Sequence, residues 1–573
     1  MTPEEMTELL AALWTWVAAP AAALAALVLT VRLKLPQLLQ LPAAFRALRE
    51  EDDGAPGIVA PAAAVAMSSV LSYGAAAAVG AATAVALGGP GAMAWAWIFS
   101  FLLAPVRMGE AVLARTAPPG QAGGATGSLA GRLLADASPV ARGLGWSVLI
   151  LVPLAGFAFY GGVHGAAVVD AAAQLLPGSA LVLGVAVAGV GLVLALLPTK
   201  RFGALLGWIA AVSLIALFGA ALVTLFSDLG RGLGGFSRAF NDAIYDMPST
   251  GAFSGAAAGE IAFAAVLYLL PPLASTAGAD GAWHAAAQAK TTKGQAAAAL
   301  LGALTYGVLT TVLGLSLVAT NAFTRPVETT RPVGEVTFYD APFDTVSQRE
   351  ERSRRFDGII RVIDGDTGVV TTHPGVERSM ILTPTFEENG EPGNVMLRIQ
   401  RGRVIEIQRP GTLGALETAE PAAMRTVLVR GRMTPRGGLL LAESVSRGGG
   451  AITSRVALAA LLLLAALGAA GWGFGVRKTL AARIPDAQAR FAAAIPSLGL
   501  GLAATGVWRG FDAFGLVVAA VLTVAVSLVL LLKSGEIATL LAGRKTAAAP
   551  TAAPTQEAED ASPTKKKRKK RKA

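Results

Sequence analysis

Two acidic residues lie in or beside apolar stretches of this chain, an arrangement expected of an ion site inside a membrane. Glu260 lies in the apolar segment 256–270, and Asp280 follows shortly after it. Ionisable side chains within membrane spans commonly carry protons, ions or substrates. Ser275 and Thr276 add hydroxyl oxygens suited to sodium or a polar solute. Alternatively, each carboxyl group lies at a wet end of its segment and has no such role.

A second candidate site is centred on Gly74, within the apolar run 58–87. Gly74 and Gly80 weaken a helix there, and a helix that unwinds in mid-membrane offers its backbone to a solute, as in many secondary transporters. The alternative is that small residues simply let helices pack closely. Glycine content alone favours the packing explanation.

The composition excludes several function classes. The chain has 573 residues, of which 54% are hydrophobic and 15% charged, which is typical of a polytopic helical membrane protein. Cysteine is absent and the three histidines are far apart, so a thiol nucleophile and a multi-histidine metal site are not expected. No phosphate-binding loop, nucleophile elbow or metal-binding helix motif appears, so the chain is not expected to be an enzyme.

The hydropathy pattern predicts about eleven transmembrane helices. A polar, amphipathic segment follows the first helix, residues 228–255 are predicted as a polar loop, and Pro271 and Pro272 are expected to stop the helix that precedes them. The predicted spans are 9–31, 58–87, 92–114, 144–163, 179–197, 202–226, 256–270, 296–319, 457–473, 491–504 and 514–532.

The composition becomes polar between residues 321 and 452, where short β-type runs alternate with turn signals. This pattern predicts a small antiparallel sandwich or barrel inserted between the membrane segments. Its turn at 364–368 has some features of a calcium loop but lacks the later bidentate Glu, so a tight hairpin is expected. The runs are 358–364, 368–373, 379–384, 394–400, 403–409, 426–433 and 438–445.

The distribution of Lys and Arg predicts the orientation. Positive charges gather in alternate loops, which places the N-terminus outside, the C-terminus in the cytoplasm and the β-rich insertion in the periplasm of a bacterial inner membrane. The net charge of +10 resides mainly in the run KKKRKKRK at 565–572. Residues 546–573 are therefore predicted to be a disordered tail that binds anionic lipid rather than nucleic acid. The predicted domains are 1–320 and 453–545 in the membrane, 321–452 and 546–573.

Two motifs carry a resemblance to a known family. ATAVALGGPGAMAWAW at 82–97, followed by RMGEAVLAR at 107–115, resembles the sodium:alanine symporter family, also called the alanine or glycine:cation symporters. The resemblance implies an inverted-repeat transporter fold of the LeuT/APC type, a small amino acid as solute, sodium as a possible coupling ion and no other cofactor. By the same resemblance, the solute would contact residues at two broken helices, namely Gly74, Ala75, Ala77, Ser275, Thr276, Gly278 and Tyr306.

The chain departs from the family at these breaks. Ala75 and Ala77 replace a Thr and an Asn, Leu273 and Ala274 replace an Asn and a Glu, and Tyr306 replaces an Asp. Three explanations remain open. The protein carries a different solute, or it is proton-coupled or uncoupled with Asp280 or Glu260 as the titrating group, or it transports nothing and acts as a scaffold or sensor for a periplasmic partner of its β-domain.

Two further residues match the family. Glu110 matches a family Glu and is expected to form a structural pair with Arg107 near the cytoplasmic face. His284 matches a family His, and helix packing is the favoured explanation for it.

Overall fold

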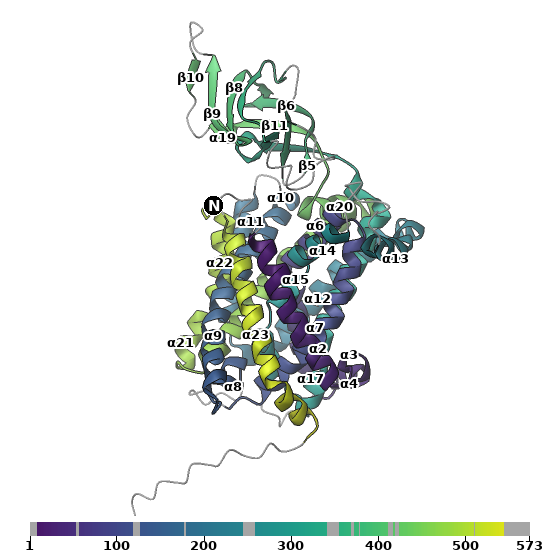
Figure 1. The fold of residues 1–573 in the computed structure, drawn as a ribbon, viewed down its shortest axis with the longest axis vertical. Coiled ribbons are helices and arrows are strands. Elements are labelled where there is room, and N and C mark those ends of the chain that lie inside the picture. Colours follow the sequence, from purple (N-terminus) through teal and green to yellow (C-terminus); the bar gives the residue numbers. More distant parts are fainter. Residues whose placement is uncertain are drawn as a thin grey trace, which may run out of the picture.

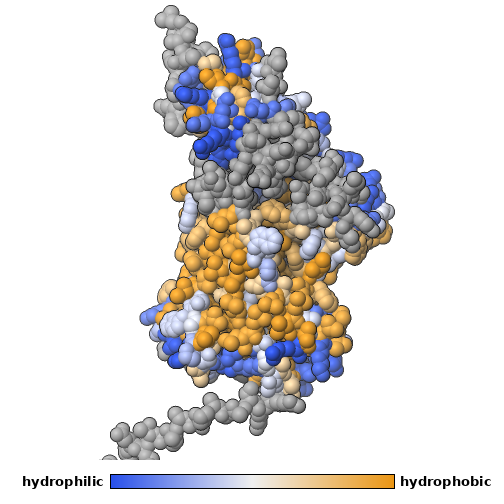
Figure 2. Space-filling model, viewed as in Figure 1, coloured by the Kyte–Doolittle hydropathy of each residue, from blue (hydrophilic) through white to orange (hydrophobic). Residues whose placement is uncertain are grey.

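Helices form one long body, and β-strands form a second part at one end of it (Figure 1). The computed structural model describes residues 9–52, 57–118, 127–176, 179–244, 258–340, 355–367, 372–376, 379–410, 416–418, 423–508 and 510–543. The predicted tail at 546–573 lies outside these residues. Apolar side chains cover a broad area of the helical body on the face shown in Figure 2, and hydrophilic side chains border this area at the end far from the strands.

Among the described residues, seven helices are long and apolar enough to cross a membrane, and a bent pair makes an eighth candidate. The bent pair consists of α5 (Pro61–Ser72) and α6 (Ala75–Gly88), which meet at 46°. The prediction of a multi-span helical membrane protein is therefore confirmed. The seven are Leu9–Arg32, which includes α2 (Ala19–Arg32); α7 (Gly91–Arg115); Pro139–Leu175, which comprises α9 (Pro139–Ala155), η2 (Gly156–His164) and α10 (Gly165–Leu175); Gly203–Phe226 in α12 (Thr199–Phe226); α17 (Thr292–Thr320); α20 (Gly437–Leu480); and α23 (Phe511–Leu541).

Shorter helices connect and cover these spans. The polar loop predicted at 228–255 is wrong in its first part, because α13 (Leu229–Ile244) is a helix. Its aromatic side chains share one face, where Phe236 and Phe240 lie 5.8 and 5.0 Å from the ring of Trp97 on α7. The other short helices are α3 (Pro36–Leu39), α4 (Leu41–Ala47), α8 (Leu129–Leu134), α11 (Ala180–Leu196), α14 (Ala258–Tyr268), α15 (Leu270–Ala274), α16 (Asp280–Ala285), α21 (Asp486–Ala492) and α22 (Ile495–Thr505).

α14 ends at Tyr268, just before Pro271 and Pro272, as predicted, and a second interruption follows. Pro271 and Pro272 belong to the first turn of α15, where a proline needs no hydrogen-bond donor and fits the helix. The main interruption is the turn between α15 and α16, in which Gly278 has φ +101°. Glycine adopts this conformation without the strain that a side chain would bring.

The β-strands form two sheets, with strand orders β1-β11-β6-β7 and β3-β8-β9-β2-β4-β5, and β10 pairs with β9. The predicted strand at 438–445 is wrong, because these residues begin α20. Leu441 and Val445 are buried four residues apart, which is a helical spacing. The strands are β1 (Val327–Pro332), β2 (Thr337–Tyr339), β3 (Gly358–Val362), β4 (His373–Val376), β5 (Ser379–Met380), β6 (Leu382–Glu388), β7 (Glu391–Pro392), β8 (Val395–Gln400), β9 (Arg403–Pro410), β10 (Leu416–Thr418) and β11 (Val427–Met433).

An ionic network ties the turn between α8 and α9 to α23. Lys533 contacts Asp136 and lies 3.0 Å from Glu536, which also pairs with Arg132. Burial on its own would raise the pKa of Asp136. The hydrogen bonds from Lys533 and the Ser138 amide, with the charges of Lys533 and Arg132, outweigh burial and lower that pKa.

We expect Asp136→Asn to lower the free energy of unfolding in detergent by about 1 kcal/mol at pH 7. Because the pKa of Asp136 is depressed in the folded protein, its contribution is present above the ordinary value near 4 and is lost as the pH falls below it. Thermal unfolding between pH 7 and pH 3 measures this difference. Asp228→Asn, at a side chain that is 39% exposed, is the control and should change little. A loss of equal size at both pH values would contradict the prediction.

Candidate functional site

Arg107 connects the two interrupted spans. It lies on α7 with 1% of its side chain exposed, and its Nη2 donates to Ser72 Oγ at 3.1 Å and to the Leu273 carbonyl at 2.6 Å. The same atom contacts Thr276 Oγ1, and Nη1 lies 3.3 Å from Asp280 Oδ2. Ser72 ends α5, whereas Leu273, Thr276 and Asp280 lie in α15, in the turn after it and at the start of α16. One guanidinium group therefore holds both interruptions together.

Glu110, one turn further along α7, binds the backbone at the start of α16. Its Oε1 accepts hydrogen bonds from the amides of Gly278 and Gly281, each at 2.7 Å. The first N–H groups of a helix lack partners within that helix and carry partial positive charge, which a carboxylate satisfies. The prediction that Glu110 forms an ion pair with Arg107 is therefore wrong, because each side chain has other partners. Arg107 pairs with Asp280, and Glu110 caps the interruption.

His284 lies beside the Asp280 carboxylate, so it does more than pack between helices. Its Nε2 is 3.8 Å from Asp280 Oδ2, and its Nδ1 is 2.9 Å from Gln295 Nε2 on α17. Arg115, at the end of α7, donates to the carbonyls of His284 and Ala287 at 2.8 and 2.9 Å. The second interruption thus gathers Arg107, Glu110, Asp280 and His284 in the protein interior.

The first interruption is covered by a histidine that sequence reasoning did not identify. Gly74 is extended, with φ −86° and ψ −165°, and α6 begins directly after it with Ala75 and Ala77 in its first turn. The amide of Ala76 approaches His164 Nδ1 at 3.5 Å. His164 comes from the π-helical stretch η2 and is fully buried, with its ring stacked 4.2 Å from that of Tyr160. No motif in the sequence surrounds His164, so only the tertiary structure places it there.

Tyr306 lies between the two interruptions. Its hydroxyl donates to the Leu269 carbonyl at 2.7 Å, and its ring meets the edge of Tyr73 at 5.6 Å. Ser275 donates to the Pro271 carbonyl at 2.5 Å within its own segment. The predicted site residues other than Glu260 therefore surround the two interruptions. Glu260 belongs to α14, but its side chain lies outside the described residues.

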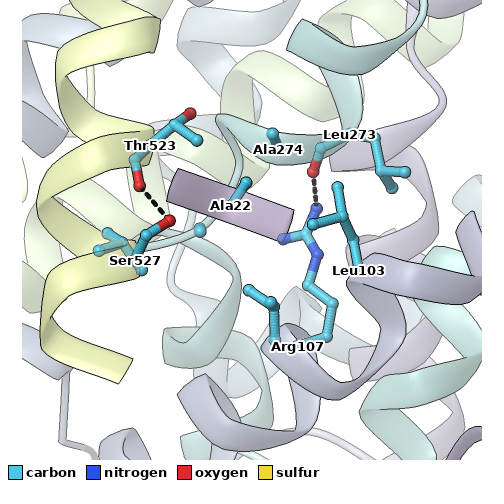
Figure 3. Close-up of a pocket in the computed structure, with 10 residues that line it drawn as sticks. Ala22, Leu103, Arg107, Leu273, Ala274, Thr523 and Ser527 are labelled. Atoms are coloured by element: carbon cyan, nitrogen blue, oxygen red, sulfur yellow. Dashed lines mark hydrogen bonds between the residues drawn. The ribbon is translucent and has the colours of Figure 1, made fainter. Parts of the chain in front are cut away.

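A small pocket opens beside Arg107, between α2, α7, α15 and α23 (Figure 3). The guanidinium group forms one wall, and Thr523 and Ser527 on α23 lie across from it. Both hydroxyls donate to carbonyls of their own helix, at 2.8 and 2.7 Å. The pocket has room for roughly one water molecule, so no amino acid fits it in this conformation. Sequence reasoning did not include these two residues.

The described residues contain no cluster of three His, Asp or Glu side chains arranged for a metal ion. A sodium ion would need carbonyl and hydroxyl oxygens instead. The hydroxyls of Ser275 and Thr276 were predicted to serve such an ion. In the structure, however, Ser275 donates to the Pro271 carbonyl and Thr276 contacts Arg107. In this arrangement the second interruption holds charged side chains rather than a ring of free oxygens.

We expect Arg107→Met to destabilise the protein by about 3–5 kcal/mol, because it leaves Asp280 buried without its cation. The double variant Arg107→Met/Asp280→Leu should recover much of this loss, since no unpaired charge remains from that contact. Thermal unfolding of the parent, Arg107→Met, Asp280→Leu and the double variant in the same detergent measures the difference. Arg231→Met, which removes a pair that is about 40% exposed, should have little effect. Additive losses at Arg107 and Asp280 would contradict the assignment.

Residues 3–329 match the sodium:alanine symporter family, which is more than half of the chain. A search of curated proteins finds no significant match. The matched residues include the bent pair α5/α6, the helix that carries Arg107 and Glu110, and the second interruption. The members of this family are transporters rather than enzymes. The chain is a multi-span membrane transporter that belongs to the sodium:alanine symporter family.

Proposed function

We propose that the chain is a cation-coupled carrier of a small neutral amino acid, such as alanine or glycine. The observation that carries this proposal is the bent span α5/α6, joined at its break to a second interrupted span through Arg107. Interrupted helices meeting near the middle of a membrane are the usual solute sites of secondary transporters. The family match supports the same class of transport.

The residues at the first break favour a small solute. Gly74, Ala75 and Ala77 present little more than backbone, and the aromatic pair Tyr73 and Tyr306 closes the space beside them. The first amides of α6 would bind the carboxylate of an amino acid once His164 moves aside. We infer that Ser275, Thr276 and Gly278 complete the solute site and that Asp280 takes part in ion coupling. The present structure would then be a closed conformation.

The same proposal includes the inverted-repeat fold of the LeuT/APC type with eleven spans. Three shorter apolar helices, α11, the α14–α15 segment and α22, would bring the eight candidates to eleven. The helices α4, α8 and α21 lie toward the end opposite the strands (Figure 1). Their basic residues Arg46, Arg132 and Arg490 support a cytoplasmic location for that end. We accordingly place the insertion 321–452 outside and the polybasic tail 546–573 at the cytoplasmic lipid surface.

A second function is favoured by one specific observation. Both helix starts that would face a solute are occupied, since His164 covers α6 and Glu110 caps α16. A relative that no longer transports would have such a filled interior. It would act instead as a membrane scaffold or sensor for a periplasmic partner of the strands β1–β11.

Uptake of labelled alanine and glycine into proteoliposomes tests the carrier. We expect accumulation that requires a sodium or proton gradient. Gly74→Ala should reduce it by at least about tenfold, because the added Cβ would lie 2.8 Å from the His164 ring and displace the break. Gly219→Ala is the matched control, because no atom lies within 4 Å of its added Cβ. Folded protein without uptake or exchange of either amino acid would reject the carrier and favour the scaffold.

A further inference from the structure

The second interruption holds two buried acids, and only one of them has an ion-pair partner among the described residues. Glu110 and Asp280 are 0 and 1% exposed, and Arg107 is the cation that contacts this pair, through Asp280. Glu110 makes no ion pair among the described residues. If both carboxyl groups were ionised, one negative charge would be buried without a balancing cation.

The neighbouring bases do not supply that charge. Gln295 Nε2 is a donor and meets His284 Nδ1, so the imidazole accepts there and is neutral, with its own proton on Nε2 toward Asp280. Arg115 directs Nη1 at the carbonyls of His284 and Ala287 and forms no ion pair with either carboxylate. Arg107 therefore balances one of the two acids, and the other needs a further positive charge.

The remaining surroundings are apolar. A Cβ built on Gly278 would meet Val152 at 2.8 Å and Leu522 and Val148 at 3.8 and 3.9 Å, on α9 and α23. On the side of α20, Ala279 packs against Gly475. Water has little access to such a site. A carboxylate without a partner in these surroundings takes up a proton rather than remaining charged.

A proton fits this site better than a metal cation does. Glu110 Oε1 already accepts two amide hydrogen bonds, and Asp280 Oδ2 faces the Arg107 guanidinium. Glu110 Oε2 and Asp280 Oδ1 are buried and have no hydrogen-bond partner in the described part of the chain. Two free oxygens are too few for a hard metal cation, which takes about six oxygen ligands, but they suffice for one proton.

We propose that Glu110 and Asp280 bind one exchangeable proton between them and that this proton is the coupling cation of transport. The second part rests on the proposed carrier function. The proton converts one carboxylate to a carboxylic acid when the site is closed, and it leaves to water when the second interruption opens. Because Glu110 also holds the amides of Gly278 and Gly281, gain and loss of the proton are linked to the position of α16.

Infrared spectroscopy tests the proton itself, independently of transport. At pH 7 the parent protein should show a C=O stretching band of a neutral carboxyl group that is absent from Glu110→Gln. In this variant Arg107 still pairs with Asp280, the one acid that remains, so no proton is needed. Glu443→Gln, which removes a carboxylate 30% exposed on α20, should leave the band unchanged. Retention of the band in Glu110→Gln, or its absence from the parent, would overturn the proposal.

Transport then tests the coupling. In proteoliposomes, an inward proton gradient should drive alanine or glycine accumulation by the parent. Glu110→Gln should lose this accumulation by about tenfold or more while still exchanging labelled for unlabelled solute. Accumulation driven by sodium alone and unaffected by Glu110→Gln would overturn the proton as coupling ion but retain the carrier. Absence of both uptake and exchange in the parent would reject the carrier and, with it, the coupling, while the infrared result would still decide whether the proton site exists.

Discussion

The arrangement of the membrane body depends on one buried guanidinium group. Where a helix is interrupted inside a membrane, its free carbonyls and amides have no water to bind, so other groups in the protein must satisfy them. Arg107 does this for the carbonyl of Leu273 and reaches Ser72 and Asp280 from the same position. A buried cation is stable only beside an acid, and Asp280 provides it. The geometry of both interruptions therefore follows from a single charge on α7.

The two helix starts at these interruptions are satisfied in different ways. An ionisable carboxyl group, Glu110, serves α16, whereas a neutral ring, His164, covers α6. The first contact depends on charge, and the second depends on the close approach that Gly74 allows. A change in protonation would alter the first much more than the second. Under the proposed carrier function, the second interruption would serve the ion and the first would serve the solute.

Much of the fold is predictable from the sequence, because membrane spans and β-runs have distinct hydropathy patterns. The Gly74 break, the change of composition after residue 320 and most strands agree with the structure. The secondary structure of a short apolar segment is predicted wrongly where the segment packs against residues far away in the sequence. Residues 438–445 read as a strand until their helical burial is known, and α13 reads as a loop until Trp97 provides a surface for its aromatic face.

The candidate site was predictable in its location but not in its contacts. Gly74, Ser275, Thr276 and Asp280 mark the interruptions from sequence alone. The partners of Arg107 and the role of His164 require knowledge of which helices face one another, and that depends on packing between residues up to 173 positions apart. Hydropathy carries no information on such pairs.

The two helices that flank the strands β1–β11 in the sequence, α17 and α20, lie side by side. Thr320, at the end of α17, is 2.8 Å from Ser444 in the first part of α20, and Asp170 binds the amide of Gly438 at the start of that helix. In the topology of the membrane body, the insertion is therefore a long loop between two neighbouring helices. The entropy of closing such a loop grows only slowly with its length. An extramembrane module of this kind can be gained, lost or exchanged during evolution without moving the helices that surround Arg107.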